Sequence, residues 1–545
     1  MSTHVTRRQF ASAGAAASLA ALLPRDIFSQ PGASKKAVIH ASEEVATIRP
    51  ELHSHFAEHL GSCTYGGIWV GKNSPIPNIN GYRKATVDYL KELGVPVLRW
   101  PGGCFADDYH WRDGIGPAAQ RPRRVNVNWG HYTEDNSFGT HEFVGFCKLI
   151  GAEPYFAANV GTGSPREFRD WIEYCNFPKG STLSDERAAN GSPEPFNVRY
   201  WGVGNELWGC GGNFQPEAAA AEFRHYATFG NLIGAHRDMQ RLTGTPGVYL
   251  VGCGPNGNDV RWTRGFMDTL AARGPMPNGY SMHYYETGTL DPLHFTPEAS
   301  ATQFNIFPRV EQAIVQQRTL LDSYDPQRRI GLFLDEWGVW DRIPASDEEK
   351  YGKLWMQSTM RSAVAAGLGL NIFNRQADKL HMCNIAQIVN VLQAVLMTDG
   401  PEGKNCVRTT SYYAFMMFKP HRGATALKVD YDGMNAGMDG GRGGRGGAQD
   451  PSPELSASAS KRGNQMVVTL VNPRHDLAMD VDCALRDATA KSGSATILHD
   501  ADLNAYNSFD NPDRVTIKPH QVAVNGASFR IALPAMSVAT ITLNL

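Results

Sequence analysis

The stretch Val198-Arg-Tyr-Trp-Gly-Val-Gly-Asn205-Glu206-Leu-Trp208 begins with β-branched and aromatic residues, as a buried strand does, and ends in an amide beside a carboxylic acid. Strand interiors rarely end in this way, because an ionised carboxylate is costly to bury without partners. Glu206 therefore belongs either to a solvated loop or to a site, and this stretch alone does not decide between them.

The same order of elements repeats along the chain from Pro50 onward: a short hydrophobic strand, a Gly- or Pro-rich loop with polar groups, and a helix. Strands that alternate with helices favour parallel pairing. Eight such units predict a (β/α)8 TIM barrel; a doubly wound sheet is the alternative, but no G-x-G-x-x-G follows the first strand. The predicted strands are Leu52–Phe56, Pro96–Trp100, Glu153–Ala158, Val198–Val203, Val248–Gly252, Tyr280–Tyr284, Ile330–Leu334 and Leu368–Phe373.

The two ends of the chain differ from this repeat. Thr6-Arg7-Arg8-Gln9-Phe10 precedes an apolar run too short to span a bilayer, and this order resembles a bacterial Tat signal. We therefore expect residues 1–34 to be a signal and linker, and the protein to be exported to the periplasm or outside the cell. We expect residues 35–49 to add a strand to the C-terminal domain and 50–397 to form the barrel. Residues 398–545 read as an antiparallel β-sandwich with a mobile Gly-rich loop at 432–449.

Composition excludes some classes of function. A formal net charge of -2 argues against a broad nucleic-acid interface, which needs a strongly basic face. The nine cysteines are scattered singly, with no C-x-x-C pair, which argues against a disulfide scaffold and a structural zinc site. We expect most of them to be buried thiols.

Nearly every predicted strand ends in a polar or ionisable residue, and chemistry in a TIM barrel gathers at these ends. The second candidate acid, Glu336, lies in Ile330-Gly-Leu-Phe-Leu-Asp335-Glu336-Trp337. Strand alternation with Leu334 facing the interior would open Glu336 onto the mouth and turn Asp335 toward the helices. Two carboxylic acids over one mouth, one protonated and one ionised, fit glycoside hydrolysis. The strand-end residues are Glu58, Arg99, Asn159, Asn205, Glu206, His283, Tyr285, Glu336 and Asn374.

Several segments, in order along the barrel, resemble the α-L-arabinofuranosidases of glycoside hydrolase family 51. They are Ile48-Arg-Pro-Glu-Leu-His-Ser-His-Phe-Ala-Glu58-His-Leu-Gly61, Leu98-Arg99-Trp-Pro-Gly-Gly-Cys-Phe105, Trp111-Arg-Asp-Gly-Ile-Gly-Pro117, Gly204-Asn205-Glu206, Ser281-Met-His283-Tyr-Tyr285, Asp335-Glu336-Trp-Gly-Val-Trp340 and Ala386-Gln387-Ile-Val-Asn-Val391. The resemblance implies a retaining hydrolase with Glu206 as general acid/base and Glu336 as nucleophile. It implies no metal or other cofactor, and a pocket for the arabinofuranosyl group of a polysaccharide or oligosaccharide. By position, the pocket residues are Glu58, Arg99, Cys104, Asn205, His283, Tyr285 and Gln387.

Two departures from the family pattern bear on the substrate. Cys104 stands where relatives usually carry Asn, and a thiol cannot replace the hydrogen bonds of an amide. Glu206 is followed by Leu-Trp-Gly-Cys-Gly-Gly rather than Met-Asp-Gly. The resemblance therefore leaves the sugar contact at Cys104 and the subsite beyond the cleaved bond undefined.

Other readings stay open at this point. Clan relatives with the same two Glu residues include β-xylosidases and endo-β-glucanases. A carbohydrate-binding protein with a silent site is a different class. His53-x-His55 also resembles the metal ligands of metal-dependent barrel hydrolases. We expect no membrane contact after export. A homo-oligomer is possible, and the composition of the chain does not test it.

Overall fold

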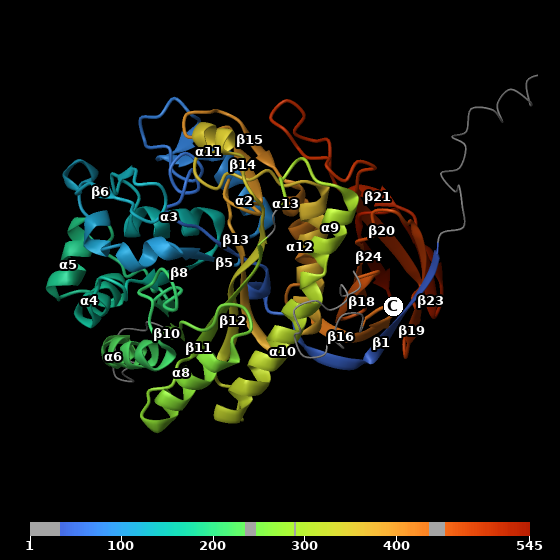
Figure 1. The fold of residues 1–545 in the computed structure, drawn as a ribbon, viewed down its shortest axis with the longest axis horizontal. Helices are drawn as coiled ribbons and strands as arrows, with labels where there is room; N and C mark the ends of the chain where they lie inside the picture. The colour runs from blue at the N-terminus through green and yellow to red at the C-terminus, as the bar shows by residue number, and fades with distance from the viewer. Residues whose placement is uncertain (1–32, 235–246, 288–289, 435–452) are drawn as a thin grey trace, which may run out of the picture.

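The computed structural model describes residues 33–234, 247–287, 290–434 and 453–545. The predicted signal and most of the Gly-rich segment at 432–449 lie outside these residues. A closed barrel of eight parallel strands with its helices forms the larger part of the molecule, and a ten-stranded sheet lies at its side (Figure 1). Within the described ranges, no helix is both long and apolar enough to cross a membrane.

The barrel strands lie next to one another in the order in which they occur in the chain. Their C-terminal ends therefore meet at one mouth. The strands are β2 (Ser54–Phe56), β5 (Val97–Trp100), β8 (Glu153–Ala158), β9 (Tyr200–Val203), β10 (Tyr249–Gly252), β11 (Gly279–Thr287), β12 (Gly331–Trp340) and β13 (Leu380–Ala386).

Helices surround the barrel, and most of them bury apolar side chains in its core, whereas α11 (Ala345–Tyr351) has no buried residue. They are α2 (Lys84–Leu93), α3 (Thr140–Ile150), α4 (Pro165–Asn176), α5 (Thr182–Ala189), α6 (Pro216–Gly234), α8 (Val260–Ala272), α9 (Pro297–Phe304), α10 (Ile306–Tyr324), α11 (Ala345–Tyr351), α12 (Met360–Arg375) and α13 (Thr410–Phe418). Large side chains fill the barrel interior below the mouth, so it is a packed core and not a channel: Val97, Tyr155, Tyr200, Val251, Phe333 and Met382.

The prediction for the eighth strand is wrong. Leu368–Phe373 lies inside α12, and the strand is Leu380–Ala386. Every residue of α12 is buried, because one side packs on Trp337 of the barrel and the other on Val471 and Val538 of the sheet. A helix buried on all sides carries no polar face, so its sequence reads like that of a buried strand.

The second domain is a largely antiparallel sheet in the order β21-β20-β24-β18-β17-β16-β1-β19-β23-β22. Strands from both halves of this order share one core, so the sheet curves around it. The strands are β1 (Ala33–Thr47), β16 (Thr425–Tyr431), β17 (Ser456–Arg462), β18 (Gln465–Asn472), β19 (Met479–Arg486), β20 (Ser492–His499), β21 (Lys518–His520), β22 (Ala523–Asn525), β23 (Ser528–Leu533) and β24 (Ser537–Asn544).

The first described strand, β1, lies among the last ones in the chain, as its blue colour among red strands shows (Figure 1). It pairs antiparallel with β16 and parallel with β19. Residues 398–424 do not belong to this sheet: they hold β15 (Cys406–Arg408), which pairs with β14 (Leu396–Thr398), and α13, which packs in the barrel core.

Candidate active site

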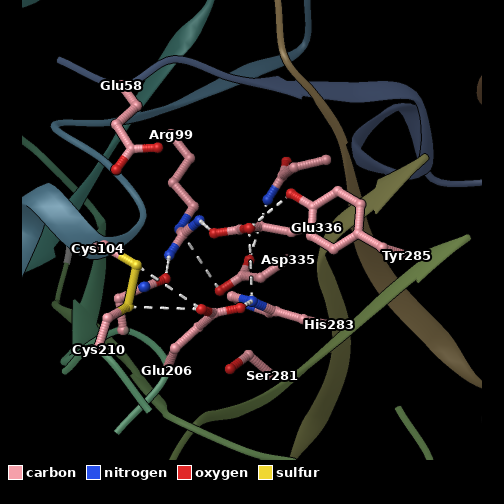
Figure 2. Close-up of polar contacts among 12 residues, drawn as sticks. Glu58, Arg99, Cys104, Glu206, Cys210, Ser281, His283, Tyr285, Asp335 and Glu336 are labelled. Carbon is pink, nitrogen blue, oxygen red and sulfur yellow. Dashed lines mark hydrogen bonds and ion pairs between the residues drawn. A yellow bond between two sulfur atoms is a disulfide. The ribbon is translucent and has the colours of Figure 1, made fainter. Parts of the chain in front are cut away.

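Two carboxylates face each other over the mouth of the barrel (Figure 2). Glu206 follows β9, and Glu336 lies on β12. Each has an oxygen within 4.8 Å of the other, and the ring of His283 on β11 lies between them. The two acids named from the sequence are therefore neighbours in space.

Glu206 reaches this position through a sharp turn after β9. Gly204 has φ +80, and an added Cβ there would meet the Leu207 side chain at 2.8 Å. Glu206 itself has φ +43, which side chains rarely adopt, and such residues are often held at functional sites by their surroundings. Here the buried Asp107 carboxylate holds the turn, since it accepts a 2.8 Å hydrogen bond from the Asn205 N–H.

Glu336 faces the mouth because the pairing of β12 with β11 shifts by one residue. Leu334 pairs with Met282 and Glu336 pairs with His283, which leaves Asp335 as an extra residue. The expectation that Leu334 faces the interior and Asp335 faces the helices is wrong. Phe333 fills the interior, and Asp335 points inward below Glu336, where it accepts hydrogen bonds from the Tyr155 hydroxyl and the Asn384 amide.

The surroundings of Glu336 favour its ionised form. Arg99 donates to Glu336 Oε1 at 2.7 Å, and the Tyr285 hydroxyl donates to Oε2 at 2.7 Å. Burial alone would raise the pKa of Glu336, but the charges of His283 and Arg99 and these hydrogen bonds hold that pKa below its ordinary value. An ionised carboxylate is what a nucleophile at this position requires.

His283 is held between the two acids. Its Nδ1 lies 2.9 Å from Glu206 Oε1 and 3.6 Å from Glu336 Oε2. Burial opposes a charged imidazole, but the two carboxylates outweigh it and raise the pKa of His283 above its ordinary value. The two acids differ in access to water: the side chain of Glu206 is 18% exposed and that of Glu336 is 6% exposed.

Glu58 forms the opposite wall of the site. Its carboxyl accepts hydrogen bonds from the Phe105 N–H, the Trp129 indole and the Gln387 amide. Burial, with the charge of Glu336 in addition, raises the pKa of Glu58 to about 7. Glu58 and Glu336 thus titrate in different pH ranges although both are buried.

The site opens into a cavity of about 320 Å³, whose walls combine these polar groups with aromatic and aliphatic side chains. Within the described residues, Asn205 Nδ2 and Gln387 Oε1 are buried and have no hydrogen-bond partner. A free donor and a free acceptor of this kind suit the hydroxyls of a sugar. The lining residues are Glu58, Leu60, Gly103, Cys104, Trp129, Glu206, Trp208, Asn256, Tyr285, Glu336, Trp340, Leu354, Gln387 and Leu392.

The structure brings together the two acids and all seven pocket residues named from the sequence, but it leaves two strand-end residues outside the site. Asn159 bonds to the backbone of its own loop, and Asn374, on α12, contacts His53 and Ser458. The histidines of His53-x-His55 also lie away from the mouth. His55 packs on Phe415 of α13 and has its pKa lowered to about 3 by burial.

The reading of Cys104 as a thiol is wrong, because Cys104 forms a disulfide with Cys210. The other seven cysteines are free, and six of these are buried. Sequence reasoning missed Asp107, Trp129 and Cys210. Asp107 sits in an ordinary-looking Asp-Asp pair, and nine single cysteines give no sign of which two meet. The two departures from the family pattern, at Cys104 and in the residues after Glu206, therefore meet in this disulfide.

Comparison with known proteins agrees with this geometry. The model of the α-L-arabinofuranosidase 1 domain matches residues 89–290, and that of the α-L-arabinofuranosidase C-terminal domain matches residues 335–537. An intracellular exo-α-L-arabinofuranosidase of Bacteroides ovatus is 40% identical over 93% of this chain and 95% of its own length. The chain belongs to the α-L-arabinofuranosidases of glycoside hydrolase family 51.

Solved structures of this family share the whole architecture. The family 51 arabinofuranosidase from Xanthomonas axonopodis pv. citri has a TM-score of 0.85 and 36% identity, and the match covers 94% of this chain and 100% of that one. The α-L-arabinofuranosidase of Thermotoga maritima, solved with arabinose, has a TM-score of 0.78 and 28% identity over 94% of this chain. The protein is therefore a glycoside hydrolase with the fold expected from its sequence, a (β/α)8 barrel with a C-terminal antiparallel sheet domain.

Proposed function

We propose that this arabinofuranosidase works by double displacement with net retention of configuration. Glu336 attacks the anomeric carbon while Glu206 gives its proton to the departing oxygen. Glu206 then takes a proton from water, the water attacks the anomeric carbon, and Glu336 is released with its bond to the sugar broken. The observation that supports retention is that carboxylate oxygens of Glu206 and Glu336 lie within 4.8 Å of each other. The two carboxyl groups of retaining enzymes are about 5 Å apart, whereas those of inverting enzymes are more than about 6.5 Å apart.

The same geometry supports an exo action on terminal arabinofuranosyl groups of plant polysaccharides or oligosaccharides. A cavity of about 320 Å³ suits one sugar unit better than a chain that passes through. The Bacteroides ovatus relative is named an exo-α-L-arabinofuranosidase. Aromatic walls at Trp129, Trp208 and Trp340 suit the apolar faces of sugar rings.

We also propose export through the Tat pathway to the periplasm or the cell exterior. The support is Arg7-Arg8 before a weakly apolar run. The Bacteroides ovatus relative is named intracellular, so location is a point on which the two proteins would differ. Fractionation of cells that produce the native chain and an Arg7→Lys/Arg8→Lys variant tests this: loss of the exported form in the variant supports it, and equal distribution contradicts it.

The catalytic proposal is tested with 4-nitrophenyl glycosides that differ only in the sugar, followed by NMR of the first anomer formed. We expect the α-L-arabinofuranoside to be cleaved far faster than the β-D-xyloside or β-D-glucoside, with the α-anomer of arabinose released first. Release of the β-anomer first would contradict retention. Preference for the xyloside or glucoside would contradict the assigned sugar.

A further inference from the structure

The Cys104–Cys210 disulfide connects two loops at the mouth of the barrel. Cys104 begins the turn that follows β5, and Cys210 lies in the turn that Glu206 begins, where the Gly209 and Gly211 N–H groups bond to the Glu206 carbonyl. In the barrel, β8 lies between β5 and β9. The disulfide therefore spans one strand and ties the backbone around Glu206 to a second wall of the cavity.

Both sulfur atoms lie beside the carboxyl of Glu206 (Figure 2). Cys210 Sγ is 3.5 Å and Cys104 Sγ is 3.9 Å from Oε2, whereas Oε1 is held by His283 at 2.9 Å. A disulfide carries no hydrogen and so donates nothing to Oε2. Because Oε1 is already bound, Oε2 is the oxygen left to carry the proton that the leaving group takes.

We propose that this disulfide is a positioning element for the general acid, which keeps Oε2 of Glu206 directed into the cavity on the side where the leaving group departs. The inference rests on the proposed role of Glu206 as acid/base and goes beyond it. Its specific consequence is that substrates with poor leaving groups depend on the disulfide, because they need the proton in the first step.

The contacts around the disulfide distinguish this role from a purely structural one. Asp107 already joins the three neighbouring loops, since it accepts hydrogen bonds from the backbone of Val160, Gly161 and Asn205. Glu336 is fixed by Arg99 and Tyr285, neither of which touches the disulfide. Loss of the disulfide therefore leaves the fold and the nucleophile in place and frees the turn from Glu206 to Cys210.

The disulfide is accessible to a reductant. Cys210 is exposed and Cys104 is partly exposed, whereas six of the seven free thiols are buried. A dithiol such as dithiothreitol supplies two electrons and two protons, closes its own disulfide, and leaves two protein thiols. The native enzyme can therefore be compared with the disulfide intact and with the disulfide reduced.

The experiment measures kcat/KM for 4-nitrophenyl and methyl α-L-arabinofuranoside on the native enzyme before and after reduction, with the state of Cys104 and Cys210 verified by mass spectrometry. We expect a loss on the order of tenfold or more for the methyl glycoside and less than about twofold for the nitrophenyl one, because proton donation contributes about 10²–10⁴-fold where it is needed. Reoxidation should restore the activity.

A Cys104→Ala/Cys210→Ala variant should have the kcat/KM values of the reduced enzyme, and dithiothreitol should not change them. A Cys483→Ala variant in the sheet domain should respond to dithiothreitol as the native enzyme does. Equal losses, or none, for the two substrates after verified reduction would overturn the inference. Glu206→Ala is measured beside them. If Glu206→Ala lowers kcat/KM equally for the two substrates, the acid/base assignment itself is wrong. If Glu206→Ala impairs the methyl glycoside more but loss of the disulfide does not, the assignment of Glu206 holds and the proposed role of the disulfide is wrong.

Discussion

Replacing Glu58 by Gln tests the electrostatics of the buried carboxyl beside the nucleophile. Burial, with the charge of Glu336 in addition, raises the pKa of Glu58 from 4.5 to about 7. The folded protein therefore holds this proton more tightly than the unfolded chain does. The resulting stabilisation is fully present below pH 4.5 and is lost as the pH rises through about 7. Since one pKa unit is worth about 1.4 kcal/mol, the loss amounts to about 3 kcal/mol of unfolding free energy.

Gln at this position imitates the protonated acid. Its carbonyl oxygen can keep the hydrogen bonds that Glu58 Oε1 accepts from the Phe105 N–H and the Trp129 indole. Its NH2 group then faces Gln387, whose Oε1 has no partner among the described residues and can accept after a half-turn of the amide. The variant therefore keeps the packing and removes only the titration.

The assay is urea unfolding of the native enzyme and of Glu58→Gln between pH 4.5 and 8, followed by tryptophan fluorescence. We expect the native enzyme to lose about 3 kcal/mol relative to the variant across this range. A difference that stays constant with pH would refute the reasoning. The same comparison in a Glu336→Gln background is the control, and its pH-dependent difference should be smaller because a charge that raises the pKa of Glu58 is gone.

Four further variants test the other groups of the site. Glu336→Ala should abolish turnover, with azide restoring part of it, whereas Glu206→Ala should impair substrates with poor leaving groups far more than aryl glycosides; similar kinetics on both substrate types would contradict the assigned roles. Tyr285→Phe removes a hydrogen bond to Glu336 worth about 1.5–3 kcal/mol, so kcat should fall on the order of tenfold to a hundredfold. The acidic side of the pH–activity profile of Tyr285→Phe should also move to higher pH, because the pKa of Glu336 rises when this hydrogen bond is lost. An unchanged profile would count against the role of Tyr285. Asp107→Asn leaves one of three backbone donors without an acceptor and should lower the unfolding free energy by about 1–3 kcal/mol, seen as a lower Tm in calorimetry, and an unchanged Tm would show that the loops are held otherwise.

Much of this architecture is readable from the sequence because barrel strands end in polar residues that a packed interior would not tolerate. Asn205-Glu206 and Asp335-Glu336 follow apolar runs, and that contrast marks both acids as candidates for the mouth, although β12 continues past Glu336 to Trp340. The pattern of Leu368–Phe373 wrongly predicts a strand because α12 is buried on every side, so its sequence lacks the polar face by which helices are recognised.

The finer geometry of the site depends on features that residue patterns do not encode. The direction of Asp335 follows from a one-residue shift in strand pairing, which strict alternation cannot anticipate. The disulfide joins residues separated by 106 positions, and their proximity exists only after β5 and β9 have taken their places in the barrel. Asp107 acts through backbone N–H groups, which every residue but proline possesses, so no partner residue marks its role.

The position of β1 has a consequence for how the protein is made. This strand is synthesised before the rest of the described chain, and both of its neighbours, β16 and β19, come more than about 370 residues later. Until they emerge, β1 has no partner, and the two groups of strands that it joins remain separate. A transport route that accepts only folded protein would therefore reject a chain that stops before β19, because such a chain cannot complete the ten-stranded sheet.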